Sequence, residues 1–267
     1  MLVTLLSDFG TSDYFAGAMR GAVLTANPRA QVVDITHDIP AHDIEAGAFT
    51  LAAAFTAFPA GTVHVAVVDP GVGSARAALV VEAAGHLFVG PDNGLFGHVY
   101  ERAAAGLRVH RLPRENPFGR PQSNTFHGRD LFAPVAGTLS RGARPSELSC
   151  EEVSDFVRLP LARPGLAPDG TLEASVIHVD RFGNLVTNLT PEHLRDDDLR
   201  AGRVRLRFAG REVRGFRRFY AEEAGDPAAP FAIWGSAGFL EISLDRASAA
   251  RALGARRGHK VIVTGDR

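Results

Sequence analysis

Up to about position 145 the chain alternates short β-branched runs with longer, alanine-rich amphipathic runs. This alternation is typical of βαβ units, in which helices connect the strands of a parallel sheet. The predicted strands are LVTLLSDFG, AQVVDITH and TVHVAVVD, and the predicted helices between them are YFAGAMRGAVLTA and HDIEAGAFTLAAAF. The pattern therefore predicts an α/β fold with an N-terminal, mostly parallel sheet and flanking helices.

After the third strand the pattern predicts a hairpin, a short helix, a strand and a longer helix. The corresponding runs are ALVVEAAGHLFVG, LFGHVYERA, LRVHRL and RDLFAPVAGTLSRG. The hairpin is expected to turn at Ala84 and Gly85. Pro134 lies in the first turns of the last run, so that helix is expected to begin later than the run itself.

The architecture changes after residues 158–170, RLPLARPGLAPDG, which hold three prolines and two glycines and show no apolar periodicity. We interpret this segment as a linker between an α/β domain, 1–157, and a second domain, 171–267. The second domain consists of short alternating runs joined by glycine or asparagine turns. This pattern predicts a small antiparallel β-barrel.

Charge and cysteine content narrow the class of partner. The 29 basic and 30 acidic residues give a net charge of −1, which provides no electrostatic reason to expect a nucleic acid or an anionic membrane. A small-molecule partner is expected instead. The single cysteine, Cys150, cannot form an intrachain disulfide, and no signal peptide or membrane span is recognised in the sequence, so a cytoplasmic location is expected.

Two aspartates, Asp8 and Asp69, follow predicted parallel strands directly. The carboxyl ends of such strands line the ligand site of an open sheet, so both residues are candidates for binding or catalysis. The ordinary alternative is that each aspartate caps a helix or closes a turn. Two strands with the same ending favour the functional interpretation.

The stretch TFHGRD places His127 just before a predicted helix. A solitary histidine is more often structural, but Asp69, Arg76 and His127 together supply a base, a cation and a titratable ring. A metal site built from Asp8, Asp69 and a histidine stays open as an alternative, although His37, His42 and His64 lack the spacing of a metal site.

Two further stretches, DPGVGSAR and VDRFGNLVTN, contain glycine or asparagine turns beside polar residues. The glycines of DPGVGSAR lack both the six-position dinucleotide fingerprint and the Lys-Ser/Thr ending of a phosphate loop, so neither nucleotide-binding motif is predicted. In the second domain, VDRFGNLVTN places Asp180, Phe182, Asn184 and Asn188 around a turn. Ordinary turn chemistry explains these residues as well as a binding function does.

Seven stretches, taken in order, resemble the S-adenosylmethionine (SAM) hydroxide adenosyltransferases, which are adenosine-forming SAM hydrolases related to the SAM-dependent fluorinase and chlorinase. The stretches are LLSDFG, DIPAHDIEAGA, VVDPGVGSAR, GPDNGLFG, TFHGRD, VDRFGNLVTN and GSAGFLEI. The resemblance spans nearly the whole chain. It implies hydrolysis of SAM to adenosine and methionine without a cofactor or metal, in a homotrimer whose sites lie between subunits.

The resemblance also assigns roles. It implies that Asp69, Arg76 and His127 hold and activate a water molecule. The residues that it places on the substrate are Asp8 on the ribose diol, Asn184 and Tyr220 on the adenine, Ser236 and Asp180 on the methionine end, and Glu241 as a weaker match. Where halogenases of the family carry a tryptophan, this chain has His42, which leaves that wall of the site unassigned.

A SAM-dependent halogenase is the closest alternative. A halide site needs neutral donors, yet Asp69 stands where the compared halogenases have tyrosine and would repel an anion. Gly128 stands where they have a serine donor, and their extended insertion is missing here. Water is therefore the expected nucleophile. A non-catalytic adenosine or SAM sensor and a metal-dependent hydrolase are the remaining alternatives, and the (R)-sulfonium epimer is the substrate that the resemblance allows as preferred.

Overall fold

The chain divides into two compact units, Met1–Leu161 and Ala162–Arg267. The computed structural model describes residues 1–103, 106–114, 118, 123–213, 215–222, 226 and 228–265. The division between the units falls inside the predicted linker, 158–170, while the predicted domain limits themselves stay a prediction. Each unit has a hydrophobic core of its own.

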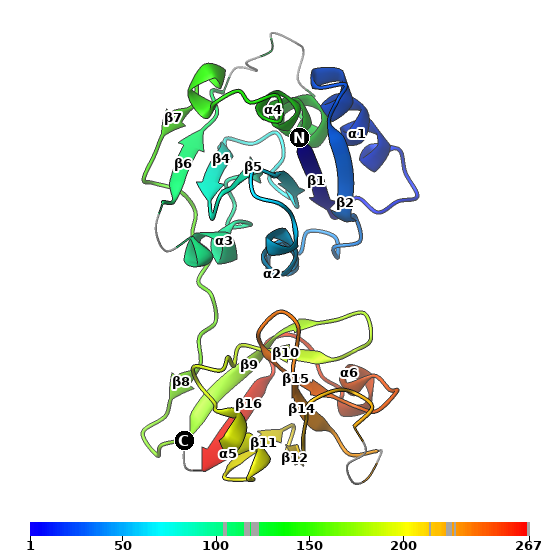
Figure 1. Ribbon diagram of the computed structural model, residues 1–267, viewed down its shortest axis with the longest axis vertical. Coiled ribbons are helices and arrows are strands. Elements are labelled where there is room, and N and C mark those ends of the chain that lie inside the picture. The colour runs from blue at the N-terminus through cyan, green and yellow to red at the C-terminus, as the bar shows by residue number, and fades with distance from the viewer. Residues whose placement is uncertain are drawn as a thin grey trace. The chain divides into compact units, whose positions relative to one another are not determined.

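The first unit is built on a seven-stranded sheet with the strand order β2-β1-β3-β5-β4-β6-β7 (Figure 1). Its strands are β1 (Leu2–Ser7), β2 (Gln31–Thr36), β3 (Val63–Val67), β4 (Ala78–Ala83), β5 (His86–Pro91), β6 (Arg108–Arg111) and β7 (Glu151–Glu152). Strands β2, β1, β3 and β5 pair in parallel, whereas β4, β6 and β7 join through antiparallel pairings. The expectation of a mostly parallel sheet therefore holds for one half of the sheet only, and the sheet as a whole is mixed.

The antiparallel half starts at the predicted hairpin. Ala84 and Gly85 both have positive φ values, 50° and 79°, as a tight two-residue hairpin turn requires. This turn makes β4 antiparallel to β5, while β5 also pairs with β3 on its other side. A tight hairpin therefore converts the parallel sheet into a mixed one.

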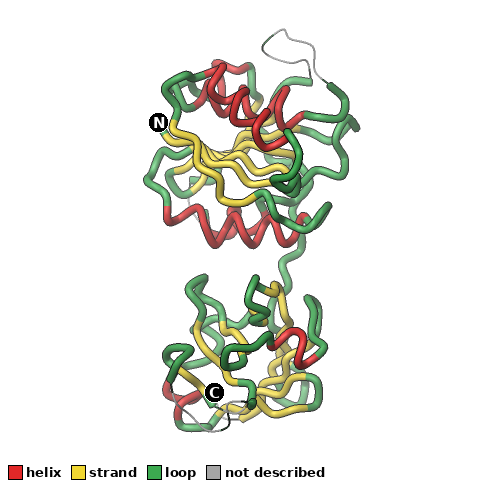
Figure 2. Tube along the Cα trace, turned by 90° about the vertical axis from the view of Figure 1, so that its right-hand side faces the viewer, coloured by secondary structure: helices red, strands yellow, loops and turns green. Residues whose placement is uncertain are grey.

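Helices cover both faces of this sheet. They are α1 (Phe15–Ala26), α2 (Ile44–Ala54), α3 (Gly97–Arg102) and α4 (Ala133–Leu139), with short 3₁₀ turns at Phe55–Ala57 and Pro145–Leu148. Figures 1 and 2 show α1 and α4 on one side of the strands and α2 on the other. The buried side chains of β3 follow this arrangement, because Val65 packs with the α1 and α4 core and Ala66 with the α2 and α3 core.

The helix predicted over RDLFAPVAGTLSRG begins with a π-helical turn, Gly128–Phe132, which continues into α4 at Ala133. Pro134 lies in the first turn of α4. The N–H of Ala133 bonds to the carbonyl oxygen of Gly128, five residues back, so Pro134, which has no N–H to donate, directly follows the wide π turn. The π turn carries the residues directly after His127.

The second unit contains a nine-stranded sheet, with the order β12-β11-β16-β9-β10-β15-β14-β13 and β8 paired to β9. The elements are β8 (Gly165–Leu166), β9 (Leu172–Val179), β10 (Leu185–Thr187), α5 (Asp196–Arg200), β11 (Val204–Phe208), β12 (Arg211–Val213), β13 (Phe216–Arg217), β14 (Phe231–Trp234), β15 (Leu240–Ser243), α6 (Ala249–Leu253) and β16 (Lys260–Gly265). The sheet is curled, but within the described part of the chain no pairing joins β12 to β13. The predicted closed antiparallel barrel is therefore not confirmed, and β13 pairs with β14 in parallel.

Candidate active site

The carboxyl edge of the parallel strands brings the first predicted site residues together. Strands β1 and β3 pair in parallel with Ser7 opposite Val67, so Asp8 and Asp69 leave neighbouring strands at the same edge. Neither carboxylate caps a helix among the described contacts. The first half of the predicted site is thus set by sheet topology.

Arg76 lies between Asp69 and His127. Its Nε donates to both carboxylate oxygens of Asp69, at 2.9 Å to Oδ1 and 3.0 Å to Oδ2, and its Nη2 contacts Oδ2 as well. The same Nη2 is 2.8 Å from Nδ1 of His127. The side chains of Asp69 and Arg76 are only 4% and 10% exposed, so this contact is largely shielded from water.

The contact with Arg76 fixes the protonation of His127. A guanidinium can only donate, so Nδ1 of His127 must accept and the ring proton must lie on Nε2. Burial, and then the Arg76 guanidinium, lower the pKa of His127 below its usual value. His127 is therefore a neutral ring near pH 7, and no direct hydrogen bond between it and Asp69 is found among the described residues.

The loop from Asp69 to Arg76 is held against the segment that precedes His127. Gly73 has a φ of +79°, and a Cβ at this position would lie 2.2 Å from the carbonyl oxygen of Asn124. Only glycine permits that approach. Gly71, in the same loop, has ordinary contacts around its Cβ position, the nearest at 3.5 Å. Gly73 is thus the position that lets the two loops meet.

Asp8 fixes the entry to helix α2. Its Oδ2 accepts a 2.8 Å hydrogen bond from the backbone N–H of His42, whose φ is +66°. The side chain of Asp8 is 8% exposed, whereas that of His42 is 74% exposed. The exposed ring of His42 contributes no buried wall in this unit.

The predicted residues of the second unit form a separate polar network. Asp180 Oδ1 accepts from the backbone N–H groups of Phe182 and Asn184, at 2.9 and 2.8 Å, and its Oδ2 accepts from Asn184 Nδ2 at 2.8 Å. Asn184 is buried and Phe182 is 78% exposed. Turn chemistry and a binding role are therefore compatible here, because the turn that Asp180 closes also presents Asn184.

Tyr220 joins this network to Glu241. Its hydroxyl donates to Glu241 Oε2 at 2.8 Å and receives a 3.5 Å contact from Asn184 Nδ2. Burial, and then the hydrogen bond with Glu241, raise the pKa of Tyr220, and burial likewise raises the pKa of Glu241. Ser236 is exposed, in the turn between β14 and β15. Glu241, the weakest of the predicted residues, thus has a definite partner.

Sequence reasoning missed Asn93 and the role of Gly73. Asn93 follows β5, another of the parallel strands that end at this edge, and its Nδ2 donates to the carbonyl oxygen of Val68 at 2.8 Å. The motif GPDNG after a strand was a usable signal, because polar residues at strand carboxyl ends are site candidates. Gly73 carried no signal, since its neighbour Asn124 is distant in sequence.

The described residues hold no group of three histidine, cysteine or acidic side chains that could bind a metal ion. His64, whose spacing in the sequence did not indicate a metal site, is fully buried in the sheet. No helix in the described part of the chain has the length and apolarity needed to cross a membrane.

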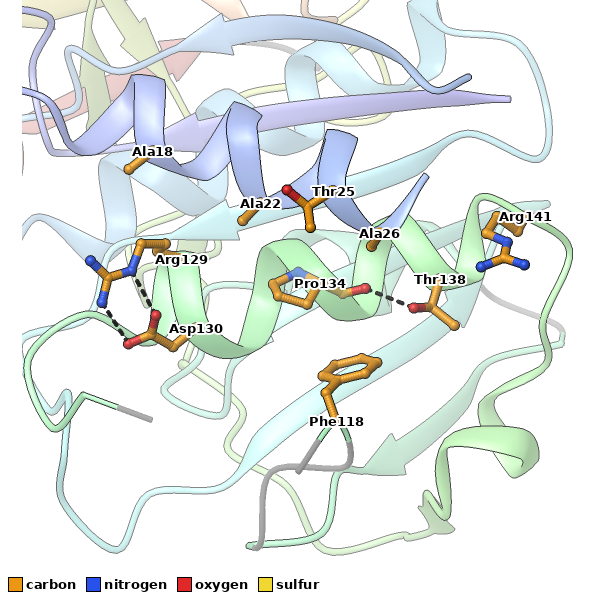
Figure 3. A pocket seen from close by; sticks show the side chains of 10 residues that line it. All are labelled: Ala18, Ala22, Thr25, Ala26, Phe118, Arg129, Asp130, Pro134, Thr138 and Arg141. Carbon is orange, nitrogen blue, oxygen red and sulfur yellow. Dashed lines mark hydrogen bonds and ion pairs between the residues drawn. The ribbon is translucent and has the colours of Figure 1, made fainter. Parts of the chain in front are cut away.

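A cavity of about 570 Å³ lies on the α1 and α4 side of the first unit (Figure 3). Its lining residues are Ala18, Ala22, Thr25, Ala26, Phe118, Arg129, Asp130, Pro134, Thr138 and Arg141. Arg129 and Asp130 are paired within it, with Nε 2.6 Å from Oδ1. The cavity includes none of the predicted site residues.

Fold and site together define a two-unit protein with an acid–guanidinium–imidazole cluster at the edge of a mixed α/β sheet and a polar network in a strand-rich second unit. Residues 3–149 match the family model of the SAM hydroxide adenosyltransferase N-terminal domain, and residues 174–262 match that of the C-terminal domain. The chain belongs to the SAM hydroxide adenosyltransferase family. The resemblance seen in the seven motifs is confirmed at this level.

Several relatives support the assignment. The (R)-S-adenosyl-L-methionine hydrolase of Thermus thermophilus is 40% identical over 271 residues, which cover 97% of this chain and 98% of that protein. A fluorinase of Nocardia brasiliensis is 24% identical over 98% of this chain and 96% of its own length. The crystal structure of an uncharacterized conserved protein from Thermotoga maritima superposes with a TM-score of 0.87 at 29% identity, covering 98% of this chain and 99% of that one.

Proposed function

We propose that this chain hydrolyses S-adenosyl-L-methionine to adenosine and L-methionine, by attack of a water molecule on the 5′ carbon of the ribose. The observation that carries the proposal is the buried contact of Asp69 with Arg76 and of Arg76 with His127, in a chain 40% identical to an (R)-S-adenosyl-L-methionine hydrolase. That relative's name also supports the (R)-sulfonium epimer as the substrate.

Asp69 is the group that accepts the proton from water. Each carboxylate oxygen can accept about two hydrogen bonds. Oδ1 receives one from Arg76, while Oδ2 receives two, so Oδ1 retains a position for a water proton. His127 donates from Nε2 in the tautomer that its contact with Arg76 imposes, so it can orient the water oxygen but does not take its proton there. Positioning and a base are the two contributions that the reaction needs.

Arg76 balances the charge of the base. The sulfonium loses its positive charge as the carbon–sulfur bond breaks, so an uncompensated carboxylate nearby would stabilise the ground state more than the transition state. Because Arg76 pairs with both oxygens of Asp69, the pair carries no net charge. The neutral thioether is a good leaving group, so no general acid is required.

Halide in place of water is disfavoured by the packing around Gly128 and by the acceptor oxygen that Asp69 presents. A Cβ at Gly128 would lie 3.1 Å from Met19 Sδ and 3.3 Å from a ring carbon of Phe126 and of Phe9. A serine donor at this position would therefore need its neighbours to shift. At the same place, Oδ1 of Asp69 can accept a proton from water but offers no donor to a halide.

The remaining predicted residues would bind the substrate. Asp8 is proposed for the ribose diol, Asn184 and Tyr220 for the adenine, and Asp180, Ser236 and Glu241 for the methionine end or its surroundings. These residues belong to two separate units, and we propose that one site combines the first unit of one subunit with the second unit of its neighbour in a homotrimer. We also propose that the curled second sheet, which carries the binding network, is an antiparallel barrel left open between β12 and β13.

Co-expression of two inactive variants tests the shared site. In Asp69→Asn the first-unit contribution is lost, and in Asn184→Ala the second-unit contribution is lost. If sites are shared, the randomly assembled co-expressed protein regains about a quarter of the parent's sites, because one interface in four combines two intact contributions. Mixed oligomers without activity would show that each site lies within one chain, and light scattering on the active protein would give the number of subunits.

We propose that the reaction needs no cofactor or metal ion, and that the protein is cytoplasmic. Activity is expected to survive dialysis against a chelator, and loss of activity restored by a divalent cation would favour the metal-dependent hydrolase.

The activity itself is tested by incubating purified protein with each sulfonium epimer and separating the products. Adenosine from the (R) epimer is the expected result, and Asp69→Asn is expected to lower turnover about 10²- to 10⁴-fold. Substrate binding without any turnover by the parent would favour the sensor.

A further inference from the structure

A short loop after β5 holds both ends of the segment from Asp69 to Arg76. Asn93 Nδ2 donates to the carbonyl oxygen of Val68, the residue before Asp69, at 2.8 Å. The backbone N–H of Asp92 donates to the carbonyl oxygen of Ala77, the residue after Arg76, at 2.9 Å. The two neighbouring residues of one loop therefore fix the two points at which the proposed catalytic segment leaves the sheet.

The tether at Ala77 also reaches the guanidinium. Arg76 Nη1 donates to the same carbonyl oxygen at 3.2 Å, so this oxygen links the loop to the side chain that contacts Asp69 and His127. Displacement of either end of the segment would change the geometry between Asp69 and Arg76. A misplacement of about 1 Å can cost about 100-fold in rate.

Asn93 is itself held in place by a local turn. Its Oδ1 accepts from the backbone N–H of Leu95 at 3.2 Å, which orients the amide so that Nδ2 points to Val68. Val68 is fully buried, so its carbonyl oxygen would be destabilising without a hydrogen-bond donor. Asp92 is anchored in turn, since its Oδ1 accepts from the backbone N–H of Val157 at 2.8 Å.

We propose that Asn93 is a positioning residue of the reaction. It acts through Val68 on Asp69 and need not touch the substrate. The inference rests on the proposed function, because it assigns to Asn93 the alignment of the group that takes the proton from water.

The matched control is Asn27, at the end of α1. It is buried, its Nδ2 donates to Ser140 Oγ at 2.8 Å, and its Oδ1 accepts from the backbone N–H two residues ahead, of Arg29, at 3.1 Å. The bonding pattern matches that of Asn93. Asn27 precedes β2, however, so it lies at the amino edge of the parallel strands, away from Asp69.

The experiment compares Asn93→Ala and Asn27→Ala in the full chain. Both are expected to lower the midpoint of thermal unfolding by a similar amount. Asn93→Ala is expected to lower kcat about 10- to 100-fold with KM within about threefold of the parent, while Asn27→Ala keeps kcat within about twofold. Equal kcat values in the two variants, or parent-like turnover by Asn93→Ala, would overturn the inference.

Asn93→Asp separates positioning from stability. The isosteric carboxylate keeps the acceptor for Leu95 but cannot donate to Val68 until it is protonated. Its rate relative to the parent is therefore expected to rise as the pH falls from 8 to 5, whereas the relative rate of Asn93→Ala stays level. A level ratio for both variants would contradict the role of the donor.

A proton NMR titration of His127 provides a readout that does not depend on turnover. Arg76 lowers the pKa of His127, so a displaced guanidinium in Asn93→Ala should let this pKa rise toward its usual value, and Asn27→Ala should leave it unchanged. An unchanged His127 pKa in Asn93→Ala would count against the inference even if the parent formed no adenosine. A parent without activity would by itself refute only the proposed function.

Discussion

Acidification is expected to destabilise the first unit through a histidine buried in the sheet. His64, on β3, is fully buried and lies between Thr4 and His86 on the neighbouring strands. Its Nδ1 is 2.7 Å from Thr4 Oγ1, and its Nε2 is 3.1 Å from Nδ1 of His86. Burial, and then the neighbouring His86, lower the pKa of His64 from 6.5 to about 3.

The direction and size of the effect follow from that shift. Because the folded state resists protonation, His64 contributes stability above the pKa of the unfolded chain, and this contribution is lost as the pH falls from 6.5 toward 3. The whole shift corresponds to about 5 kcal/mol, at about 1.4 kcal/mol per pKa unit. Between pH 7 and pH 5 the loss from this one group is about 2 kcal/mol.

His64→Gln isolates this contribution, because glutamine can hydrogen-bond to the same neighbours but does not titrate. The free energy of unfolding would be measured with urea at pH 7 and at pH 5, followed by far-ultraviolet circular dichroism. The parent is expected to lose about 2 kcal/mol more than the variant between these two pH values. An equal loss in the two proteins would show that His64 does not resist protonation in the folded state, and would refute the reasoning.

Two further predictions concern the candidate site. Gly73→Ala should cost about 1–3 kcal/mol of stability and lower turnover, because its Cβ meets a backbone carbonyl, whereas Gly71→Ala should be nearly neutral in thermal unfolding; equal effects would contradict the close approach. Arg76→Lys should lower kcat by about 100-fold, since one ammonium group cannot reach both oxygens of Asp69 and Nδ1 of His127. A parent-like kcat in steady-state kinetics would exclude the proposed role of the planar guanidinium.

The parallel half of the first sheet was predictable from the sequence, because hydrophobic periodicity is local. Each run carries its own period, and the strand ends place Asp8 and Asp69 at one edge whatever the order of strands. The position of β5 was not predictable in the same way. The turn at Ala84 and Gly85 specifies that β4 and β5 pair, but it does not specify that β5 rather than β4 lies beside β3.

The candidate site was likewise predictable only in part. The residue types Asp69, Arg76 and His127 could be selected from the sequence, while the order of their contacts could not. The position of Arg76 between the other two depends on where the π turn after His127 packs, and His127 is 51 residues from Arg76 in the chain. The motif GPDNG marks Asn93 as a polar residue at a strand end, but its proposed role was not predictable, because its partner is the backbone oxygen of Val68, which no side-chain motif marks.

The most direct test of the central claim is the source of the new oxygen. The reaction is run in ¹⁸O-water with (R)-S-adenosylmethionine, with and without added chloride or fluoride, and the products are analysed by mass spectrometry. If the water held by Asp69, Arg76 and His127 displaces methionine from the 5′ carbon, adenosine carries one label at its 5′-hydroxyl, methionine carries none, and no halogenated nucleoside forms. Unlabelled adenosine, free adenine as the main product or a 5′-halogenated nucleoside would contradict the account.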